Sequence, residues 1–267
     1  MFTFLCYFPV SPLYADTLSV FIGSASKPAM EEISGFFTKK TGTEVIAHYG
    51  GSGEMLSQML LSGRGDIYMP GSPDFMERAI RAEAVDKGSL RIVAYLVPAI
   101  NVQKGNPKNI NGLQDLARKD IRLIIANPRV VCVGLYAVEV FEANGLSMLL
   151  RPKINSYAES CARTANTIAM GAADAVMGWR VFGFWNPSRI ETILLKPEEI
   201  RRIAYIPIAI ARFTRNRDLA EKFVRFVTSP FAKKILQDRG YIMEENEARR
   251  YAPQARIGGD FKLPEGW

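Results

Sequence analysis

The sequence predicts an α/β protein in which each of two lobes contains a sheet flanked by helices. Short apolar runs rich in β-branched residues alternate with stretches whose apolar residues recur at helical spacing, which is the pattern of strand–helix–strand units. Two of the extended runs are longer than an ordinary strand and contain an internal proline. The 267 residues are enough for two lobes of roughly 100–150 residues each.

The predicted strands are the apolar runs, and the two long ones contain Pro98 and Pro207. Because proline has no N–H for a central ladder, we expect each long run to leave one sheet and join the other. The first lobe would then contain residues 16–97 and 206–267, and the second residues 98–205. A single sheet with bulged strands is the alternative. In chain order the predicted strands are Leu18–Ile22, Glu44–Tyr49, Asp66–Met69, Leu90–Val102, Arg122–Ala126, Asp174–Met177 and Ile203–Arg212.

Helices are predicted between these strands. Ser26 can cap the first helix, because the apolar residues that follow it fall at helical spacing on one face: Ala29, Met30, Ile33, Phe36 and Phe37. The same spacing predicts further helices at Gly53–Ser62, Ser72–Ala82, Leu113–Arg118, Gly134–Asn144, Tyr157–Met170 and Asp218–Gln237, the last interrupted at Ser229-Pro230.

The composition is that of a globular protein, with 48% apolar and 23% charged residues. The net charge of +7 comes from Lys and Arg residues scattered among acidic ones. Nucleic-acid binding normally needs a clustered basic surface, so we do not predict it. A mild positive excess does raise the local concentration of a small anion.

The first 15 residues predict export. They carry no charged side chain and are rich in Phe, Leu, Tyr and Val, whereas Asp16 begins amphipathic sequence. The run is shorter than the about 20 residues that span a bilayer, and Ala15 is a small residue at a plausible signal cleavage point. A basic leader is missing, so a hydrophobic strand is the alternative. No later run reaches about 18 apolar residues. We therefore expect a soluble mature protein, periplasmic or at the cell surface.

Cysteine and histidine are sparse. With Cys6 in the leader, Cys132 and Cys161 remain, either as one disulfide in an oxidising compartment or as two small buried thiols. Neither belongs to a CxxC motif, and His48 is the only histidine. We therefore predict no metal site and no cofactor.

Two turns carry the candidate chemistry. Ser24 and Ser26 follow the first predicted strand, and Ser52, between Gly51 and Gly53, follows the second. Such turns aim unpaired backbone N–H groups and the positive end of a helix dipole outward, and they lie where open α/β sheets bind ligands. Each turn alone also fits an ordinary cap. Two on successive strand–helix units favour an anion site.

No enzymatic motif accompanies them. The segment GGSGE lacks the final glycine of a nucleophile elbow, and the chain contains neither GxxxxGK[ST] nor GxGxxG at a helix start. His48 lies inside a strand-like run, which favours a structural or surface role over a general base. We predict no catalytic residue.

Three segments resemble periplasmic molybdate- and tungstate-binding proteins of ABC importers. Residues 19–79, from SVFIGSAS to PDFMERA, resemble the family's opening in order and spacing. Residues 96–146 include its hinge, its NP turn and its GxYA helix, and TIAMGAADAVMGW resembles the segment before its last ligand contact. The likeness covers about Leu18 to Gly240. It implies a two-lobed periplasmic-binding-protein-like fold joined by two crossing hinge segments.

The resemblance also implies a ligand set. In this family neutral donors hold a tetrahedral oxyanion: two serines, backbone amides and often a tyrosine. Ungapped alignment places Ala25 at the first serine, so either Ser24 or Ser26 takes its place or the contact is lost. Trp179 occupies the tyrosine position and offers one N–H where tyrosine offers a hydroxyl. The ligand-binding residues implied are Ser24 or Ser26, Ser52, the amides of Val133 and Cys161, and Trp179.

Departures from related patterns bear on the ligand. The archaeal tungstate-type pattern adds two carboxylates, but Val131 and Gly178 occupy those places, which argues against six-coordinate ligation. Arg129 and Arg180 stand beside the site, and we expect structural or surface roles for both.

The function implied is that of a monomeric substrate-binding component, not an enzyme. It would capture a small oxyanion, molybdate or tungstate first, and deliver it to a membrane permease encoded as a separate chain. The alternatives are an exported sensor or binding protein of the same fold for another anion or a chelated metal, or an enzyme remnant, because fold alone does not fix function.

Overall fold

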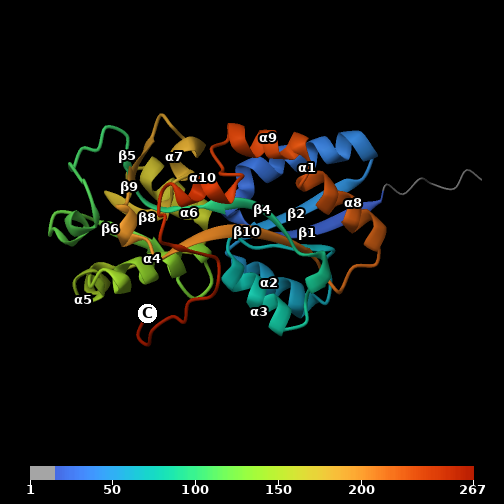
Figure 1. Ribbon diagram of the computed structural model, residues 1–267, viewed down its shortest axis with the longest axis horizontal. Coiled ribbons are helices and arrows are strands. Elements are labelled where there is room, and N and C mark those ends of the chain that lie inside the picture. Colours follow the sequence, from blue (N-terminus) through green and yellow to red (C-terminus); the bar gives the residue numbers. More distant parts are fainter. Residues whose placement is uncertain (1–15) are drawn as a thin grey trace, which may run out of the picture.

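The computed structural model describes residues 16–267, so the predicted leader lies outside the described residues. The chain forms two mixed sheets flanked by helices, which lie side by side along the long axis of the molecule (Figure 1). One sheet has six strands and the other has five. The prediction of a two-lobed α/β fold is confirmed, and the single-sheet alternative is wrong.

The six-stranded sheet has the order β11-β10-β3-β1-β2, with β4 paired to β10. Strand β1 runs parallel to β2 and β3, whereas β10 is antiparallel to β3 and β4. In Figure 1, helices α1, α8 and α9 lie on one side of this sheet and α2 and α3 on the other. The elements are β1 (Thr17–Gly23), α1 (Lys27–Thr41), β2 (Glu44–Gly50), α2 (Ser52–Ser62), β3 (Ile67–Met69), α3 (Pro73–Arg81), β4 (Arg91–Leu96), β10 (Arg202–Ile210), α8 (Arg217–Val227), α9 (Pro230–Asp238) and β11 (Arg256–Ile257).

The five-stranded sheet has the order β7-β6-β8-β5-β9. Helix α4 lies on one side of it and α6 with α7 on the other (Figure 1). The elements are β5 (Pro98–Gln103), β6 (Leu123–Ala126), α4 (Cys132–Ala143), α5 (Ser147–Leu150), β7 (Tyr157–Ala158), α6 (Cys161–Ala169), β8 (Ala175–Trp179), α7 (Phe182–Trp185) and β9 (Ile190–Leu194), with α10 (Glu245–Arg249) near the C-terminus. Short 3-10 helices occupy Ser24–Ser26, Lys87–Ser89, Leu113–Ala117, Arg151–Lys153 and Pro197–Glu199.

The two proline-containing runs behave differently. The first changes sheets as predicted: β4 pairs with β10, and β5, which begins at Pro98, pairs with β8 and β9. The prediction for the second run is wrong, because β10 stays in the six-stranded sheet throughout. A register shift between Ile206 and Pro207 accommodates the missing N–H as a bulge. The chain returns between the sheets earlier, in the segment from β9 to β10.

Most predicted helices form, with corrected ends. The interruption at Ser229 is confirmed, since its hydroxyl accepts a hydrogen bond from the N–H of Ala232 and starts α9. The helix predicted from Tyr157 begins only at Cys161, because Tyr157 and Ala158 pair with β6 and Ser160 caps α6. Leu113–Ala117 is a 3-10 helix. Among the described residues no single helix has the length and apolar character to cross a membrane; α4 and Ser147–Lys153 do so only together, across a 120° bend.

Two buried clusters hold the molecule together. One combines residues of the six-stranded sheet with Ala126, Cys132, Cys161 and Trp179 from the other half, so the halves share a core. The second fills the space around the five-stranded sheet and includes the tail residue Trp267. The indole N–H of Trp267 donates to Glu142 at 3.0 Å. The C-terminal tail therefore packs on the second half of the molecule, although β11 pairs with β10.

Candidate functional site

The two serine turns meet at one edge of the six-stranded sheet. Strands β1 and β2 are parallel, and their last residues, Gly23 and Gly50, are register partners. A Cβ on Gly23 would lie 2.7 Å from the Ser52 hydroxyl oxygen, so the absence of a side chain lets the turns touch. Ser24, Ser26 and Ser52 are all buried. The convergence expected from the sequence is therefore present.

The start of two helices from the other half faces these turns. Cys132 is the first residue of α4, and Cys161 is the first residue of α6. Their sulfur atoms are 3.5 Å apart, and neither cysteine forms a disulfide within the part of the chain that the structure describes. Val133 and Trp179, at the end of β8, are buried in the same cluster. The structure thus brings all six predicted ligand-binding residues to the region between the sheets.

Direct contacts join the two halves at this place. The N–H of Ala162 donates to the Ser24 hydroxyl at 3.2 Å, and the N–H of Gly53 donates to the Val130 carbonyl at 2.8 Å. A Cβ on Gly71 would lie 2.5 Å from the Cys132 sulfur. Such close packing excludes water and strengthens each hydrogen bond within it.

The three serine hydroxyls differ in whether their proton is already donated in a hydrogen bond within the protein. The Ser52 oxygen accepts from the N–H of Gly71 at 3.0 Å, and the Ser24 oxygen accepts from Ala162. Each of these hydroxyls keeps its own proton for a further acceptor. Ser26, in contrast, donates to the Gly23 carbonyl at 3.4 Å and makes no capping hydrogen bond to α1. Ser24 and Ser52 are therefore better placed than Ser26 to donate to an anion.

Three further donors are buried beside these turns without a hydrogen-bond partner among residues 16–267. They are the hydroxyls of Ser72 and Tyr136 and the indole N–H of Trp179. Sequence reasoning missed the first two. Ser72 follows β3 at the start of α3, which is the third equivalent turn, and Tyr136 lies one helical turn after Cys132 and packs edge-on against Trp179 at 5.0 Å. Two features of the sequence could have identified them: Ser72 repeats the serine turn that follows a strand, and Tyr136 follows Cys132 at i, i+4 spacing on the same helix face.

A buried ionic network lies behind Tyr136. The Arg202 guanidinium donates to Asp74 of α3 at 3.0 Å and to Glu139 of α4 at 2.6 Å, and its carbon lies 4.3 Å from the Tyr136 ring centroid. Burial raises the pKa of the Glu139 carboxyl, although Arg202 opposes the shift. Burial also raises the pKa of the Cys161 thiol, reinforced by the neighbouring Cys132. The charged groups of this network therefore pair with one another.

The remaining polar residues singled out by sequence are engaged elsewhere. The His48 ring stacks on Phe21 with centroids 4.7 Å apart. The Arg180 guanidinium lies over the rings of Phe184 and Tyr251. Arg129 is exposed, and its backbone carbonyl accepts a hydrogen bond from the Arg78 guanidinium at 3.0 Å. These contacts fit the structural roles expected for them.

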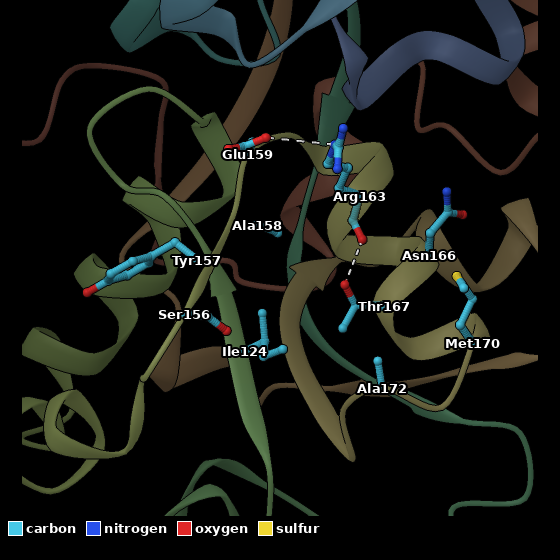
Figure 2. Close-up of a pocket in the computed structure, with 10 residues that line it drawn as sticks. All are labelled: Ile124, Ser156, Tyr157, Ala158, Glu159, Arg163, Asn166, Thr167, Met170 and Ala172. Atoms are coloured by element: carbon cyan, nitrogen blue, oxygen red, sulfur yellow. Dashed lines mark hydrogen bonds and ion pairs between the residues drawn. The ribbon is translucent and has the colours of Figure 1, made fainter.

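A separate cavity of about 660 Å³ lies beside α6 and the short edge strand β7. Figure 2 shows Glu159 and Arg163 as an ion pair at its rim, and the Thr167 hydroxyl donating to the Arg163 carbonyl. None of the predicted ligand-binding residues lines this cavity. Its residues are Ile124, Ser156, Tyr157, Ala158, Glu159, Arg163, Asn166, Thr167, Met170 and Ala172.

Two halves, each built on a sheet, that meet at buried and uncharged hydrogen-bond donors define the class of two-lobed binding proteins. The chain belongs to the family of bacterial extracellular solute-binding proteins, whose model matches residues 18–242.

Individual relatives agree with this family. A putative binding protein of Haemophilus influenzae is 24% identical over 228 residues, 85% of this chain and 91% of that protein. The molybdate-binding protein ModA of Mycobacterium tuberculosis H37Rv is 24% identical over 230 residues, 85% of each chain. Among solved structures, the periplasmic molybdate-binding protein of Azotobacter vinelandii aligns with a TM-score of 0.74 at 20% identity, covering 85% of this chain and all of that one.

Proposed function

We propose that this protein is the exported substrate-binding component of an ABC importer, which captures a small tetrahedral oxyanion, molybdate or tungstate first, and delivers it to a membrane permease. One observation carries the proposal: two serine turns of one half and two helix starts of the other converge on a buried region lined by uncharged donors. Relatives named for molybdate binding support the choice of ligand.

The ligand would be held by hydrogen bonds alone. The Ser24 and Ser52 hydroxyls each have a proton to donate, because both oxygens already accept from backbone N–H groups. The amides at the starts of α4 and α6, including those of Val133 and Cys161, add donors and the positive ends of two helix dipoles. Trp179 contributes its unpartnered N–H. Donors fixed in this way stabilise an anion without a bound cation.

Closure of the two lobes around the anion couples its binding to transport. We assign residues 16–96 and 202–267 to one moving lobe and residues 98–194 to the other, with the connections from β4 to β5 and from β9 to β10 as the hinge. An anion that contacts Ser24 from one lobe and the α6 start from the other binds the closed form better, and so favours closure. The protein acts as a monomer, in the periplasm or at the cell surface, and the permease recognises the closed form.

Trp179 bears on which anion is selected. An indole N–H is a single donor on a rigid ring. The tyrosine at this position in molybdate- and tungstate-binding proteins supplies a hydroxyl that both donates and accepts hydrogen bonds. A second candidate is therefore a binding protein of the same fold for another anion, such as sulfate or phosphate, or for a chelated metal. It differs from the first only in selectivity.

A thermal-unfolding screen tests the proposal. Purified protein would be heated with molybdate, tungstate, sulfate, phosphate or a ferric chelate. A ligand present at about a hundred times its dissociation constant adds about 2.7 kcal/mol of stability. We expect molybdate and tungstate to raise the unfolding temperature at lower concentration than the other three. No shift with any of the five would refute the proposed function, and a shift with sulfate, phosphate or the chelate alone would favour the second candidate.

A further inference from the structure

Cys132 and Cys161 form a buried pair of thiols whose sulfur atoms the proposed function leaves unused. Both side chains are 1% exposed, and the sulfurs are 3.5 Å apart. The pair is part of the wall that faces the serine turns: the Cys132 sulfur abuts Gly71, and the residue after Cys161 donates its N–H to Ser24. Any ligand held between the turns and these helix starts therefore meets two sulfur atoms.

The geometry suits one atom bonded to both sulfurs. The present separation is much longer than the about 2.05 Å of a disulfide bond. Burial and the adjacent Cys132 raise the pKa of the Cys161 thiol, so it carries its proton at neutral pH. A divalent soft cation would need thiolates and additional protein ligands. Within residues 16–267, however, no cluster of three or more His, Cys, Asp or Glu side chains could hold a metal ion.

We infer that the Cys132–Cys161 pair captures a trivalent, thiol-seeking oxyacid of the arsenite class. Two arsenic–oxygen bonds break and two arsenic–sulfur bonds form. The two thiol protons leave with the two displaced hydroxides as water, so arsenic remains trivalent and no oxidant is needed. The third hydroxyl stays on arsenic.

Charge and hydrogen bonding favour this ligand. Undissociated arsenous acid and its dithiol adduct are both uncharged, so their burial carries no penalty for desolvating an ion. The Trp179 N–H lies beside the Cys161 sulfur and makes no hydrogen bond of ordinary geometry within the described chain. It is a donor for the hydroxyl that remains on arsenic. This binding differs from that of a tetrahedral oxyanion, because sulfur bonds replace most of the hydrogen bonds.

Titration with sodium arsenite tests the inference. The full chain would be reduced with a phosphine, freed of reductant and studied by native mass spectrometry and calorimetry. We expect one arsenic per chain with the loss of two waters. Cys132→Ser and Cys161→Ser should each abolish the adduct, whereas Ser34→Ala, a change at a buried hydroxyl of α1, should retain it. No adduct in the wild type, an adduct that survives in both site variants, or tighter binding of cadmium than of arsenite would overturn the inference.

Protection mapping on the wild type covers the case of variants that fold poorly. Arsenite should shield Cys132 and Cys161 together from iodoacetamide in the native protein, as read from peptide masses. The alkylation rates of the ligand-free protein are measured first, in enough denaturant for the native protein to open and for both cysteines to react, and a rate at either cysteine that arsenite leaves unchanged would contradict the inference. The result is independent of the proposed oxyanion function, since Ser52→Ala should weaken molybdate binding and leave the arsenite adduct intact.

Discussion

The hydroxyl oxygen of Ser24 accepts a hydrogen bond from the backbone N–H of Ala162, 138 residues away, at 3.2 Å. Ser24 directly follows β1, the first strand of the six-stranded sheet, and Ala162 is the second residue of α6 beside the other sheet. The contact joins the halves at the candidate site. It also leaves the Ser24 proton free for a ligand.

This relationship predicts that Ser24 and Ser26 are not equivalent. Ser24→Ala should weaken molybdate binding by about 10- to 100-fold, because a hydrogen bond to a charged group contributes about 1.5–3 kcal/mol. Ser26→Ala is the matched control and should change affinity by less than about threefold, since its hydroxyl donates to Gly23. Calorimetric titration measures both variants. Equal losses would show that the two hydroxyls share the role.

Trp179 is predicted to set anion selectivity. Trp179→Tyr introduces a hydroxyl near the unpartnered hydroxyl of Tyr136, and Trp179→Phe removes the N–H altogether. We expect Phe to lower molybdate affinity by about tenfold, the loss of one good hydrogen bond, and Tyr to restore part of it. Competition between molybdate and sulfate, followed by calorimetry, gives the selectivity. An unchanged affinity in Trp179→Phe would exclude the indole from the ligand set.

Glu139 predicts a pH dependence of stability. Burial raises the pKa of this carboxyl in the folded protein, with Arg202 opposing and Asp74 reinforcing the shift. The stability that the Glu139 carboxyl contributes is fully present below the ordinary Glu pKa of about 4.3. It is lost as pH rises through the raised pKa that the carboxyl has in the folded protein. The difference in unfolding free energy between the wild type and Glu139→Gln should therefore shrink as pH rises from about 4 to 7.

Urea unfolding at several pH values measures this difference. Glu31→Gln, an exposed carboxyl on α1, is the matched control and should show a flatter profile. The cost of Glu139→Gln at neutral pH should stay below the about 3–5 kcal/mol of a broken buried pair, because Arg202 keeps its contact with Asp74. A difference that grows with pH would contradict the assignment.

Export predicts a processed N-terminus. The mature protein recovered from the periplasm or cell surface of its source should begin near Asp16, because the uncharged apolar run ends at the small residue Ala15. N-terminal sequencing of the native protein decides this. Unprocessed chain found in the cytoplasm would refute the export assignment.

The sequence predicts contacts that depend on local pattern better than those that depend on long-range packing. The convergence of the Ser24 and Ser52 turns follows from parallel neighbouring strands, and the interruption at Ser229 follows from a cap before proline. The predicted change of sheet at Pro207 was wrong, because a β-bulge accommodates the missing N–H and the strand stays in the same sheet. The helix predicted to begin at Tyr157 was also wrong there, because Tyr157 belongs to an edge strand that pairs with β6.

The network around Arg202 had no sequence signal at all. Its partners Asp74 and Glu139 lie 128 and 63 residues away in the chain, and only the packing of α3 against α4 and β10 brings them together. The same packing buries the hydroxyls of Ser72 and Tyr136. The serine turn at Ser72 and the spacing of Tyr136 from Cys132 are weak local signals, and only the packing shows that both hydroxyls are buried beside the site.

The most direct test of the central claim is a calorimetric titration of molybdate into the wild type, Ser52→Ala and His48→Ala. The Ser52 oxygen accepts from Gly71 and keeps its proton for the anion, whereas His48 stacks on Phe21. We predict that Ser52→Ala weakens binding by about 10- to 100-fold with folding preserved, and that His48→Ala leaves it unchanged. An unchanged affinity in Ser52→Ala, or a large loss confined to His48→Ala, would contradict the account.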